Sequence, residues 1–353
     1  MTKTIRTKSQ DIRGYILRNV SKEGLAGRVT EKFGITRQAA NRHLRSLIAE
    51  GAILGTGQTQ KRTYRLAATT SKVFGYAITS DLAEDIVWTN DIRPLLEALP
   101  DNVVAIWQWA FTEMFNNAID HSTGTQIVVR VERTALYTEI MVSDNGVGIF
   151  RKIQQEFGLS DERQALFELS KGKLTTDSRN HSGQGIFFTS RMVNAFDILS
   201  GGVYFTHAIE REHDWMVENT GDSQGTAVFM KVDNHTARTT RKTLAEFSVG
   251  DSYGFDKTIV PVKLAKYGSD QLISRSQAKR VLARVDQFSQ VIFDFSGVTE
   301  IGQAFADQIF RVFALEHPNM KLVPLNANKT ISGMILAAIK AGRPGYKGSV
   351  EKL

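Results

Sequence analysis

The segment IWQWAFTEMFNNAIDHS, residues 106–122, is apolar around most of the circumference of the helix that its pattern predicts. One polar stripe interrupts the apolar surface, because Glu113, Asn117 and His121 recur at four-residue spacing and Asp120 lies beside them. The four polar residues therefore line a single edge of a helix that is otherwise buried, and the functional interpretation of this edge is a binding site. A Glu-x-x-x-Asn pair by itself, however, is usually an ordinary helix surface, so the neighbouring segments decide.

The segment EIMVSDNGVGI, residues 139–149, predicts a strand that ends near Val142 and continues into a glycine-containing loop. Asp144 stands at the end of the strand, and Gly146 and Gly148 follow it. A carboxylate in this position accepts hydrogen bonds from a polar ring edge, and glycines let a ligand approach the backbone. The alternative for these residues alone is a tight turn closed by the aspartate.

Two more glycine motifs follow later in the chain. In HSGQGIFFTSRMV, residues 181–193, Gly183 and Gly185 open a predicted helix whose first-turn N–H groups would face an anion. The segment GTAVFMKV, residues 225–232, places Thr226 at the entrance of a strand.

The stretch SKGKLTT, residues 170–176, lies in the long segment between Gly148 and Gly183. We expect it to form a mobile lid. Lys171 and Lys173 would reach phosphate groups from such a lid, and the alternative is that both are solvated surface charges.

Taken in this order, the four motifs resemble the Bergerat-type (GHKL) ATP-binding fold of gyrase, heat-shock chaperones, mismatch-repair ATPases, histidine kinases and anti-sigma-factor kinases, over residues 75–235. The resemblance implies an α/β sandwich, with a mixed sheet and helices on one of its faces, that binds ATP and Mg²⁺. The ordered set of motifs is far more specific than any one of them. The chain has no G-x-x-x-x-G-K-[ST] sequence, which excludes a Walker-type site.

The resemblance also implies a role for each motif. Asp144 would accept a hydrogen bond from the exocyclic amine of adenine, Asn117 would ligate a Mg²⁺ ion that bridges the phosphates, and Glu113 would be the catalytic base or water-orienting carboxylate. The other implied nucleotide contacts are Gly146, Gly148, Lys171, Lys173, Gly183, Gly185 and Thr226.

The fate of the phosphate stays open. A histidine kinase carries its phosphoacceptor histidine on a separate helical hairpin upstream of this domain, and no such hairpin is evident, so the chain is not a typical histidine kinase. Glu113 keeps ATP hydrolysis and serine/threonine kinase chemistry open. A site that binds nucleotide only as structural support is the third alternative.

The positive charge of the chain is concentrated at its N-terminal end. Residues 1–72 contain 15 Lys and Arg and 4 acidic residues, a net charge of +11, whereas the rest contains 29 and 33, a net charge of −4. A basic segment attached to an acidic body is typical of a nucleic-acid-binding module, since Lys and Arg neutralise phosphates. The alternative for charge bias alone is a solvated basic surface.

The pattern of residues 8–68 favours the first interpretation. It predicts a helix carrying Ile12 and Ile16, a second helix that ends at Gly34, a third from Arg37 to about residue 50 capped by Thr36, and then a basic hairpin. This order resembles a winged helix-turn-helix domain, which implies contact with double-stranded DNA. The implied DNA-contacting residues are Arg37, Gln38, Asn41, Arg42 and Arg45 on the third helix and Lys61 and Arg62 on the wing. Some winged helices bind only proteins, and that alternative stays open.

Beyond a polar linker, DNHTARTTRKT, the C-terminal residues alternate between strand and helix signals, with strands at 291–295 and 321–325 and helices at 304–315 and 330–340. The run VIFDFSGVTEIGQAFADQIFRVF resembles the core of STAS-like domains, which implies a partner-binding face. In anti-sigma antagonists the loop before this helix carries a phosphorylated serine. Here Ile301-Gly302-Gln303-Ala304 holds no hydroxyl, so we expect docking without phosphorylation, and turn or cap roles for Ser296 and Thr299.

Composition limits the remaining classes. The chain has 353 residues, 42% of them hydrophobic, and no cysteine, which excludes thiol catalysis and cysteine-based metal sites. No apolar run is long enough to span a bilayer, and the first residues lack the apolar core of a secretion signal, so we expect a cytoplasmic protein without a membrane partner.

The sequence therefore predicts an α+β chain of three domains: a winged helix at 1–70, a GHKL domain at 75–235 and a STAS-like domain at 246–353. The predicted function is transcriptional regulation, in which Mg-ATP occupancy and contacts of the STAS-like domain with a protein partner modulate DNA binding. Homodimerisation fits paired DNA half-sites, although no interface is visible in the sequence. The alternative is an ATPase or serine/threonine kinase of anti-sigma-factor type that acts on a separate protein.

Overall fold

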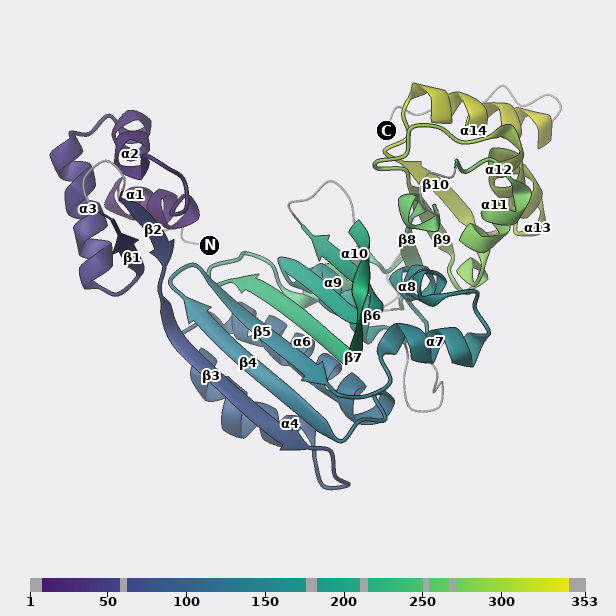
Figure 1. Cartoon of the computed structure of the whole chain (residues 1–353). Helices are drawn as coiled ribbons and strands as arrows, with labels where there is room; N and C mark the ends of the chain where they lie inside the picture. Colours follow the sequence, from purple (N-terminus) through teal and green to yellow (C-terminus); the bar gives the residue numbers. More distant parts are fainter. Residues whose placement is uncertain are drawn as a thin grey trace.

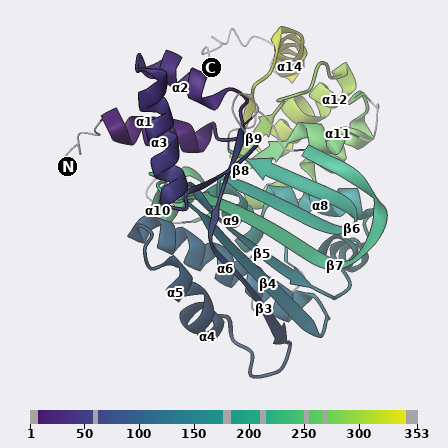
Figure 2. The ribbon, with the colours of Figure 1, turned by 60° about the vertical axis from the view of Figure 1, so that its left-hand side comes forward.

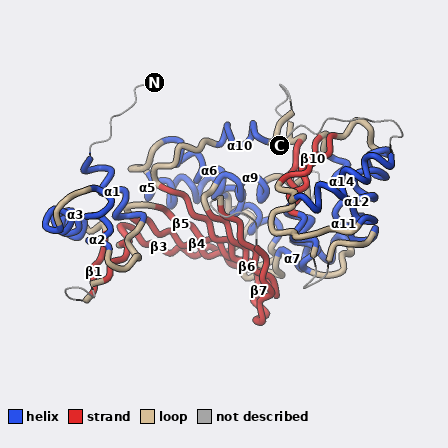
Figure 3. The backbone as a smooth tube through the Cα atoms, turned by 90° about the horizontal axis from the view of Figure 1, so that it is seen from above, coloured by secondary structure: helices blue, strands red, loops and turns tan. Residues whose placement is uncertain are grey.

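The computed structural model describes residues 8–57, 62–175, 183–209, 215–249, 254–266 and 271–342. Three successive parts follow one another along these residues (Figure 1): an N-terminal helical part, a middle part built on a five-stranded sheet, and a C-terminal part built on a three-stranded sheet. Figures 1 and 3 both place the N-terminal and C-terminal parts at opposite ends of the five-stranded sheet.

The N-terminal part contains the expected elements in the expected order: α1 (Lys8–Arg18), α2 (Leu25–Phe33), α3 (Arg37–Ala49), β1 (Ile53–Thr56) and β2 (Thr63–Leu66), the two strands pairing antiparallel. The Thr36 side chain accepts a hydrogen bond from the backbone N–H of Ala39, which confirms the predicted cap of α3. Ile16, Val29 and Leu44 belong to a hydrophobic core separate from that of the rest of the chain. That these elements form a DNA-binding winged helix stays a prediction.

Only Ala67 separates β2 from β3 (Ala68–Ala77), the strand that opens the five-stranded sheet. β3 pairs antiparallel with β4 (Gln126–Thr134) along almost its whole length. The junction between the first two parts is therefore a strand held by backbone hydrogen bonds, and it begins inside the range expected for the N-terminal domain.

The five-stranded sheet has the order β3-β4-β5-β7-β6, where β5 is Tyr137–Asp144, β6 is Ala195–Ala208 and β7 is Trp215–Asp233. We expected a mixed sheet here, but all four pairings are antiparallel. β4 with β5 and β6 with β7 form hairpins, and β3 pairs antiparallel with β4 as β5 does with β7. Parallel pairing occurs instead in the C-terminal part.

Helices cover one face of this sheet (Figure 3). Ile127, Val129 and Val131 are fully buried beneath them, whereas Val128, between two of these residues, is exposed on the other face. The helices of the middle part are α4 (Glu84–Val87), η2 (Trp88–Ile92), α5 (Arg93–Leu96), α6 (Asp101–His121), α7 (Ile149–Phe157), α8 (Glu162–Lys171), α9 (Gly185–Met192) and α10 (Thr240–Glu246). α10 lies partly within the stretch that we expected to be a polar linker, and the Thr239 side chain caps it.

The C-terminal part is an α/β layer around a parallel sheet of order β10-β9-β8. The two strands whose ranges were predicted, at 291–295 and 321–325, agree with β9 and β10 to within one residue. The predicted helix at 304–315 is present but is divided by a π-helical stretch. Its elements are β8 (Lys257–Pro261), η3 (Val262–Ala265), α11 (Arg275–Leu282), η4 (Val285–Gln287), β9 (Gln290–Asp294), α12 (Gln303–Asp307), η5 (Gln308–Phe313), α13 (Ala314–Glu316), β10 (Lys321–Leu325) and α14 (Lys329–Gly342).

The middle and C-terminal parts share one hydrophobic core. Phe187 and Phe188 of α9 pack against Phe255, which precedes β8, at ring-centroid distances of 4.6 and 4.8 Å, and Phe255 in turn contacts Phe288. Figure 2 shows β8 and β9 beside the ends of the longer strands. The two parts therefore pack as one body through an aromatic cluster. No helix in the described part of the chain is both long and apolar enough to cross a membrane.

Candidate functional site

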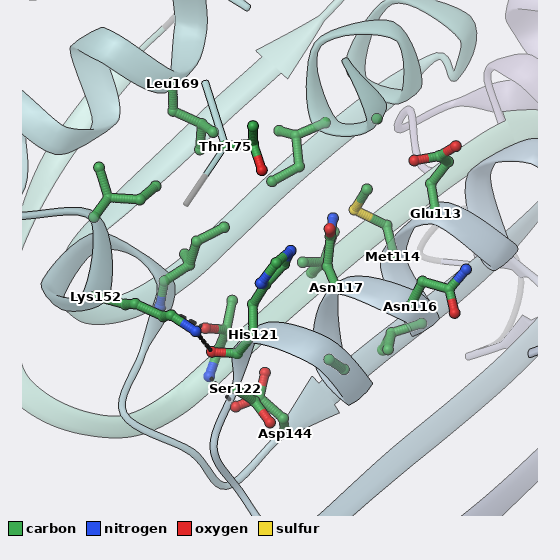
Figure 4. A pocket seen from close by; sticks show the side chains of 18 of the residues that line it. Glu113, Met114, Asn116, Asn117, His121, Ser122, Asp144, Lys152, Leu169 and Thr175 are labelled. Carbon is green, nitrogen blue, oxygen red and sulfur yellow. Dashed lines mark hydrogen bonds between the residues drawn. The ribbon is translucent and has the colours of Figure 1, made fainter. Parts of the chain in front are cut away.

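A cavity of about 240 Å³ lies between α6, α7, α9 and the inner face of the sheet. The structure brings together here six residues that the sequence motifs single out, although they come from four separate segments (Figure 4). These six residues are Glu113, Asn117, Asp144, Gly183, Gly185 and Thr226.

The polar stripe of α6 faces this cavity. Glu113, Asn117 and His121 line it, whereas Trp107 and Phe111 on the rest of the helix are fully buried in the core. Figure 4 shows the Asn117 and His121 side chains pointing into the space between α6 and the Leu169–Thr175 side of the cavity. The apolar surface of the helix thus fixes the orientation of its polar edge.

Asp144 stands at the end of β5, where its Oδ1 accepts hydrogen bonds from the backbone N–H groups of Gly146 and Thr226, at 2.9 and 3.3 Å. Burial raises the pKa of the Asp144 carboxyl above its ordinary value, and these two backbone hydrogen bonds oppose the shift. Neither of these two bonds uses Oδ2. This oxygen has the chemistry to accept a hydrogen bond from a group in the cavity.

Thr226, in the middle of β7, is hydrogen-bonded to the first turn of α7. Its Oγ1 accepts a 2.9 Å hydrogen bond from the backbone N–H of Ile149, and its own N–H donates to Asp144. The three segments that bear these residues are thereby held together at the wall of the cavity.

Gly146 and Gly148 do not line the cavity, in contrast to the role that the resemblance implied for them. A Cβ atom on Gly146 would lie 1.9 Å from the carbonyl oxygen of Ser122, at the end of α6. Gly148 has φ 89°, and a Cβ there would lie 2.7 Å from Ser200 Oγ. These glycines let the loop after Asp144 pack against its neighbours, and so they position the site without touching the cavity.

The two glycines near α9 lie against the cavity wall. A Cβ on Gly185 would be 2.0 Å from Glu113 Oε2, so the Glu113 carboxylate sits directly against the first residue of α9. Gly183 has φ 67°, and a Cβ there would be 2.6 Å from the backbone carbonyl carbon of Leu174. Only glycine fits either position without a shift of its neighbours.

Lys171 and Lys173 do not reach the cavity, contrary to the expectation that they lie on a mobile lid. Lys171 is the last residue of α8 and is buried, and its ammonium donates to the backbone carbonyls of Arg280 and Ala283 in the C-terminal part. The Lys173 ammonium donates to the carbonyl of Gln287 at 2.8 Å. Both lysines are held by distant segments of the chain. Of the expected lid, Thr176 lies outside the described residues.

Sequence reasoning missed several residues of the cavity wall. Lys152 on α7 lines it and donates a 3.0 Å hydrogen bond to the backbone carbonyl of His121, which caps the C-terminal end of α6 (Figure 4). Ile149 and Ile153 line it from the same helix. The helical spacing of these three residues directly after the Asp-Asn-Gly-Val-Gly loop is a signal that could have identified them.

These residues fit an adenine nucleotide with Mg²⁺. One end of the cavity offers a half-buried carboxylate beside apolar side chains such as Val142 and Val228, which suits a flat ring with a polar edge. The other end offers the amide of Asn117 and the backbone of two glycines at the start of α9. This combination suits phosphate groups, together with a hard cation that takes most of its ligands from those phosphates.

The residues expected to contact DNA are described except for Lys61, which lies outside the described residues. Five of them share the face of α3 opposite its buried residues Ala40, Leu44 and Leu47. These five, Arg37, Gln38, Asn41, Arg42 and Arg45, are all exposed. Arg62 is exposed at the start of β2, with its guanidinium 5.6 Å from the centre of the Tyr64 ring.

In the C-terminal part, Ser296 has the turn role that the sequence predicts. Its hydroxyl and its backbone N–H both donate to Asp294 Oδ1, at 2.8 and 3.0 Å. The loop that follows, up to Gln303, leaves Thr299, Glu300 and Gln303 exposed. The hydrogen bonds that β8, the residue after η3, and η4 make with the middle part do not involve this loop.

Two family models match the chain. Residues 104–236 match the family described as histidine kinase-, DNA gyrase B- and HSP90-like ATPase, and this range contains every cavity-lining residue. Residues 277–332 match the STAS-like domain of unknown function (DUF4325). A comparison with curated proteins found no match. The middle part thus contains a GHKL-type ATPase domain, which supports nucleotide binding. The C-terminal part contains a STAS-like domain, which is compatible with an interaction with a protein partner.

Proposed function

We propose that the chain is a DNA-binding regulator whose affinity for DNA depends on Mg-ATP in the cavity of its GHKL domain. The observation that carries the proposal is the convergence of Glu113, Asn117 and Asp144, from two distant segments, on one cavity that also contains the glycines before α9. A bare surface cluster would not combine a half-buried carboxylate with a glycine-lined helix start.

Each part of the site has one task in this proposal. Oδ2 of Asp144 accepts a hydrogen bond from the exocyclic amine of adenine, a donor that guanine does not present at the same ring position. Asn117 is the protein ligand of Mg²⁺, and the backbone N–H groups at Gly183 and Gly185 receive the phosphates.

The exposed face of α3 is the proposed DNA-contacting surface. Its three arginines, Arg37, Arg42 and Arg45, supply phosphate contacts, and Gln38 and Asn41 between them present amides that pair with adenine edges in the major groove. Because β3 continues the N-terminal part directly into the sheet of the GHKL domain, a rearrangement of that domain moves this surface. Two copies of the chain would read paired half-sites.

One observation favours a second function, that of an ATPase or serine/threonine kinase acting on a separate protein. The Glu113 carboxylate lies against Gly185 at the start of α9, where it is placed to orient a water molecule or an acceptor hydroxyl beside a bound phosphate chain. The exposed loop up to Gln303 is the proposed partner-binding face in either function.

The proposal is tested first by calorimetric titration of the full chain with Mg-ATP, Mg-ADP and Mg-GTP. The affinity of the chain for a pool of random DNA duplexes is then measured with and without Mg-ATP at one fixed salt concentration. We expect heat with the adenine nucleotides, little with Mg-GTP, and a several-fold change in DNA affinity on adding Mg-ATP. Asp144→Asn should lose both effects.

The enzyme function is separated by Glu113→Gln, which keeps the shape of the side chain. In the regulatory function this variant binds Mg-ATP as the wild type does and still changes DNA affinity. In the second function it binds but loses phosphate release or transfer to protein. DNA affinity that ignores both Mg-ATP and Asp144→Asn would refute the regulatory proposal.

A further inference from the structure

α8 is buried around its whole circumference in its last two turns. The seven consecutive residues Ala165–Lys171 are all buried, whereas a helix that packs on a single neighbour buries one face. The second neighbour is the C-terminal part: β8 and η3 pack against α8, and Figure 1 shows α8 next to β8. This helix therefore belongs to the interface as much as to the GHKL domain.

The end of α8 and the two residues after it are held by the C-terminal part, through the backbone carbonyls and the ammonium groups of Lys171 and Lys173. Thr258 Oγ1 donates to the Lys171 carbonyl at 2.6 Å, and the Arg284 guanidinium donates to the Lys173 carbonyl at 3.1 Å. The Lys171 and Lys173 ammonium groups donate in the opposite direction, to three carbonyls of the C-terminal part. We call this set the clasp: Lys171, Gly172 and Lys173 with Thr258, Arg280, Ala283, Arg284 and Gln287.

The residues on either side of the clasp form the wall of the cavity. Leu169 precedes it, Leu174 and Thr175 follow it, and all three line the cavity. The backbone of Leu174 is also the surface on which Gly183 packs. Over seven residues the chain thus touches the cavity, then the C-terminal part, then the cavity again.

The backbone at the clasp adopts conformations that the C-terminal part must support. Lys173 and Arg284 have φ values of 55° and 63°, which side chains rarely adopt, and the two residues share a hydrogen bond. Gly172, at φ 83°, packs so closely on Phe255 that a Cβ there would lie 2.7 Å from its ring. Without these contacts, Lys173 would return to a commoner conformation and Leu174 would leave its position.

Resting on the proposed function, we infer that Arg284 and Thr258 of the STAS-like domain are positioning residues of the nucleotide site, so that formation of the clasp and binding of an adenine nucleotide favour each other. Coupling between two such events is reciprocal: whatever the clasp adds to nucleotide affinity, the nucleotide returns to the clasp. A protein that draws the STAS-like domain away from α8 therefore weakens nucleotide binding.

The test measures Mg-ADP affinity of the full chain by calorimetry for the wild type and for Arg284→Ala. We expect about a tenfold loss, within the roughly 5- to 150-fold range of such couplings, and partial recovery in Arg284→Lys, which keeps a donor. Thr258→Val removes only the hydroxyl donor to Lys171 and should also weaken Mg-ADP binding. This variant keeps the inference testable if Arg284→Ala does not fold. Arg163→Ala is the matched control, because Arg163 donates to the Lys266 carbonyl from the end of α8 that lies away from the clasp. The Mg-ADP affinity of this variant should stay within about twofold of the wild-type affinity.

The reciprocal measurement is amide hydrogen exchange at residues 282–288, which Mg-ADP should slow in the wild type and not in Arg284→Ala. A wild-type chain that binds no nucleotide would overturn the proposed function and this inference together. A wild type that binds, with Arg284→Ala and Thr258→Val binding equally well, would overturn the inference alone. Equal losses in Arg163→Ala and Arg284→Ala would also overturn it, because the effect would then follow domain docking in general.

Discussion

The Lys171 ammonium donates a 2.8 Å hydrogen bond to Glu168 Oε1, three residues earlier on α8, and both side chains are 2% exposed. With the carbonyls of Arg280 and Ala283, all three ammonium protons of Lys171 have acceptors. Burial lowers the pKa of Lys171 and raises the pKa of Glu168, and their mutual attraction opposes both shifts. Each charge is therefore tolerated in the interface because the other is present.

Replacing only one partner of this pair should be costly. Lys171→Met leaves the Glu168 carboxylate buried without its counter-charge, and we expect the free energy of unfolding to fall by roughly 3–5 kcal/mol, measured by urea titration. The control is Lys231→Met, which breaks the 2.9 Å ion pair with Glu139 on the outer face of the sheet, where the side chains are 34% and 44% exposed, and which should cost about 1 kcal/mol.

The double variant Lys171→Met with Glu168→Gln separates charge from packing. It removes both buried charges and should recover a large part of the stability that Lys171→Met loses. Equal losses in Lys171→Met and Lys231→Met would contradict the view that burial decides the value of this pair.

The interface of Lys171 is also where sequence reasoning failed, and the reason is physical. The stretch from Ser170 to Thr176 has the glycine, lysine and threonine content of a solvated phosphate-contacting loop, and nothing within it indicates burial. Its partners, Arg280 and Ala283, lie more than one hundred residues later in the chain. Local patterns report local structure, and a contact between domains appears in neither partner's pattern.

Where the signal is local, the sequence was sufficient. Thr36 predicts the start of α3 because a capping hydroxyl acts on the next turn of the same helix. The polar stripe of α6 predicts the cavity wall, because a single polar edge on an apolar helix leaves one orientation. The glycines 146 and 148 were recognised as special but assigned to the ligand, since a sequence does not distinguish close packing on a ligand from close packing on Ser122 or Ser200.

Gly148 should tolerate no side chain. Its φ of 89° and the 2.7 Å approach of a Cβ to Ser200 Oγ combine backbone strain with a clash, so Gly148→Ala should lower the free energy of unfolding by about 1–3 kcal/mol. Gly333→Ala in α14 is the control, because a Cβ there meets nothing within 4 Å and alanine favours a helix by about 0.5–1 kcal/mol. Thermal unfolding of both variants checks the opposite signs, and a neutral Gly148→Ala would contradict the strain.

The carboxylate of Asp144 should weaken the folded state at neutral pH. Its folded-state pKa is raised by burial above the ordinary value of 3.8, so the folded chain binds the extra proton more readily than the unfolded chain does. The penalty is therefore fully present at neutral pH and is relieved as the pH falls through the raised pKa.

The corresponding variant is Asp144→Asn, which keeps an oxygen for the N–H groups of Gly146 and Thr226. At pH 7 we expect it to raise the free energy of unfolding by about 0.5–2 kcal/mol, as replacements of functional charges often do. The gain should shrink in urea titrations at acidic pH, once the wild-type carboxyl is protonated in both states. A gain that grows toward acidic pH would show that the pKa of Asp144 is lowered instead.

The exposed arginines of α3 should set the salt dependence of DNA binding. Each phosphate that Arg42 or Arg45 neutralises adds about 0.9 to the slope of log affinity against log salt, so the double variant Arg42→Ala with Arg45→Ala should flatten this slope by roughly 2 and weaken binding to all sequences alike. Gln38→Ala should leave the slope unchanged and reduce only the preference among sequences, because an amide reads bases and carries no charge. The control is Arg130→Ala, which removes another exposed charge, on β4, and should change neither quantity. Fluorescence anisotropy across a salt series, with duplexes of different sequence, measures both the salt slope and the preference among sequences. A slope that responds to Arg130 as much as to Arg42 and Arg45 would mean that DNA contacts the sheet and not α3.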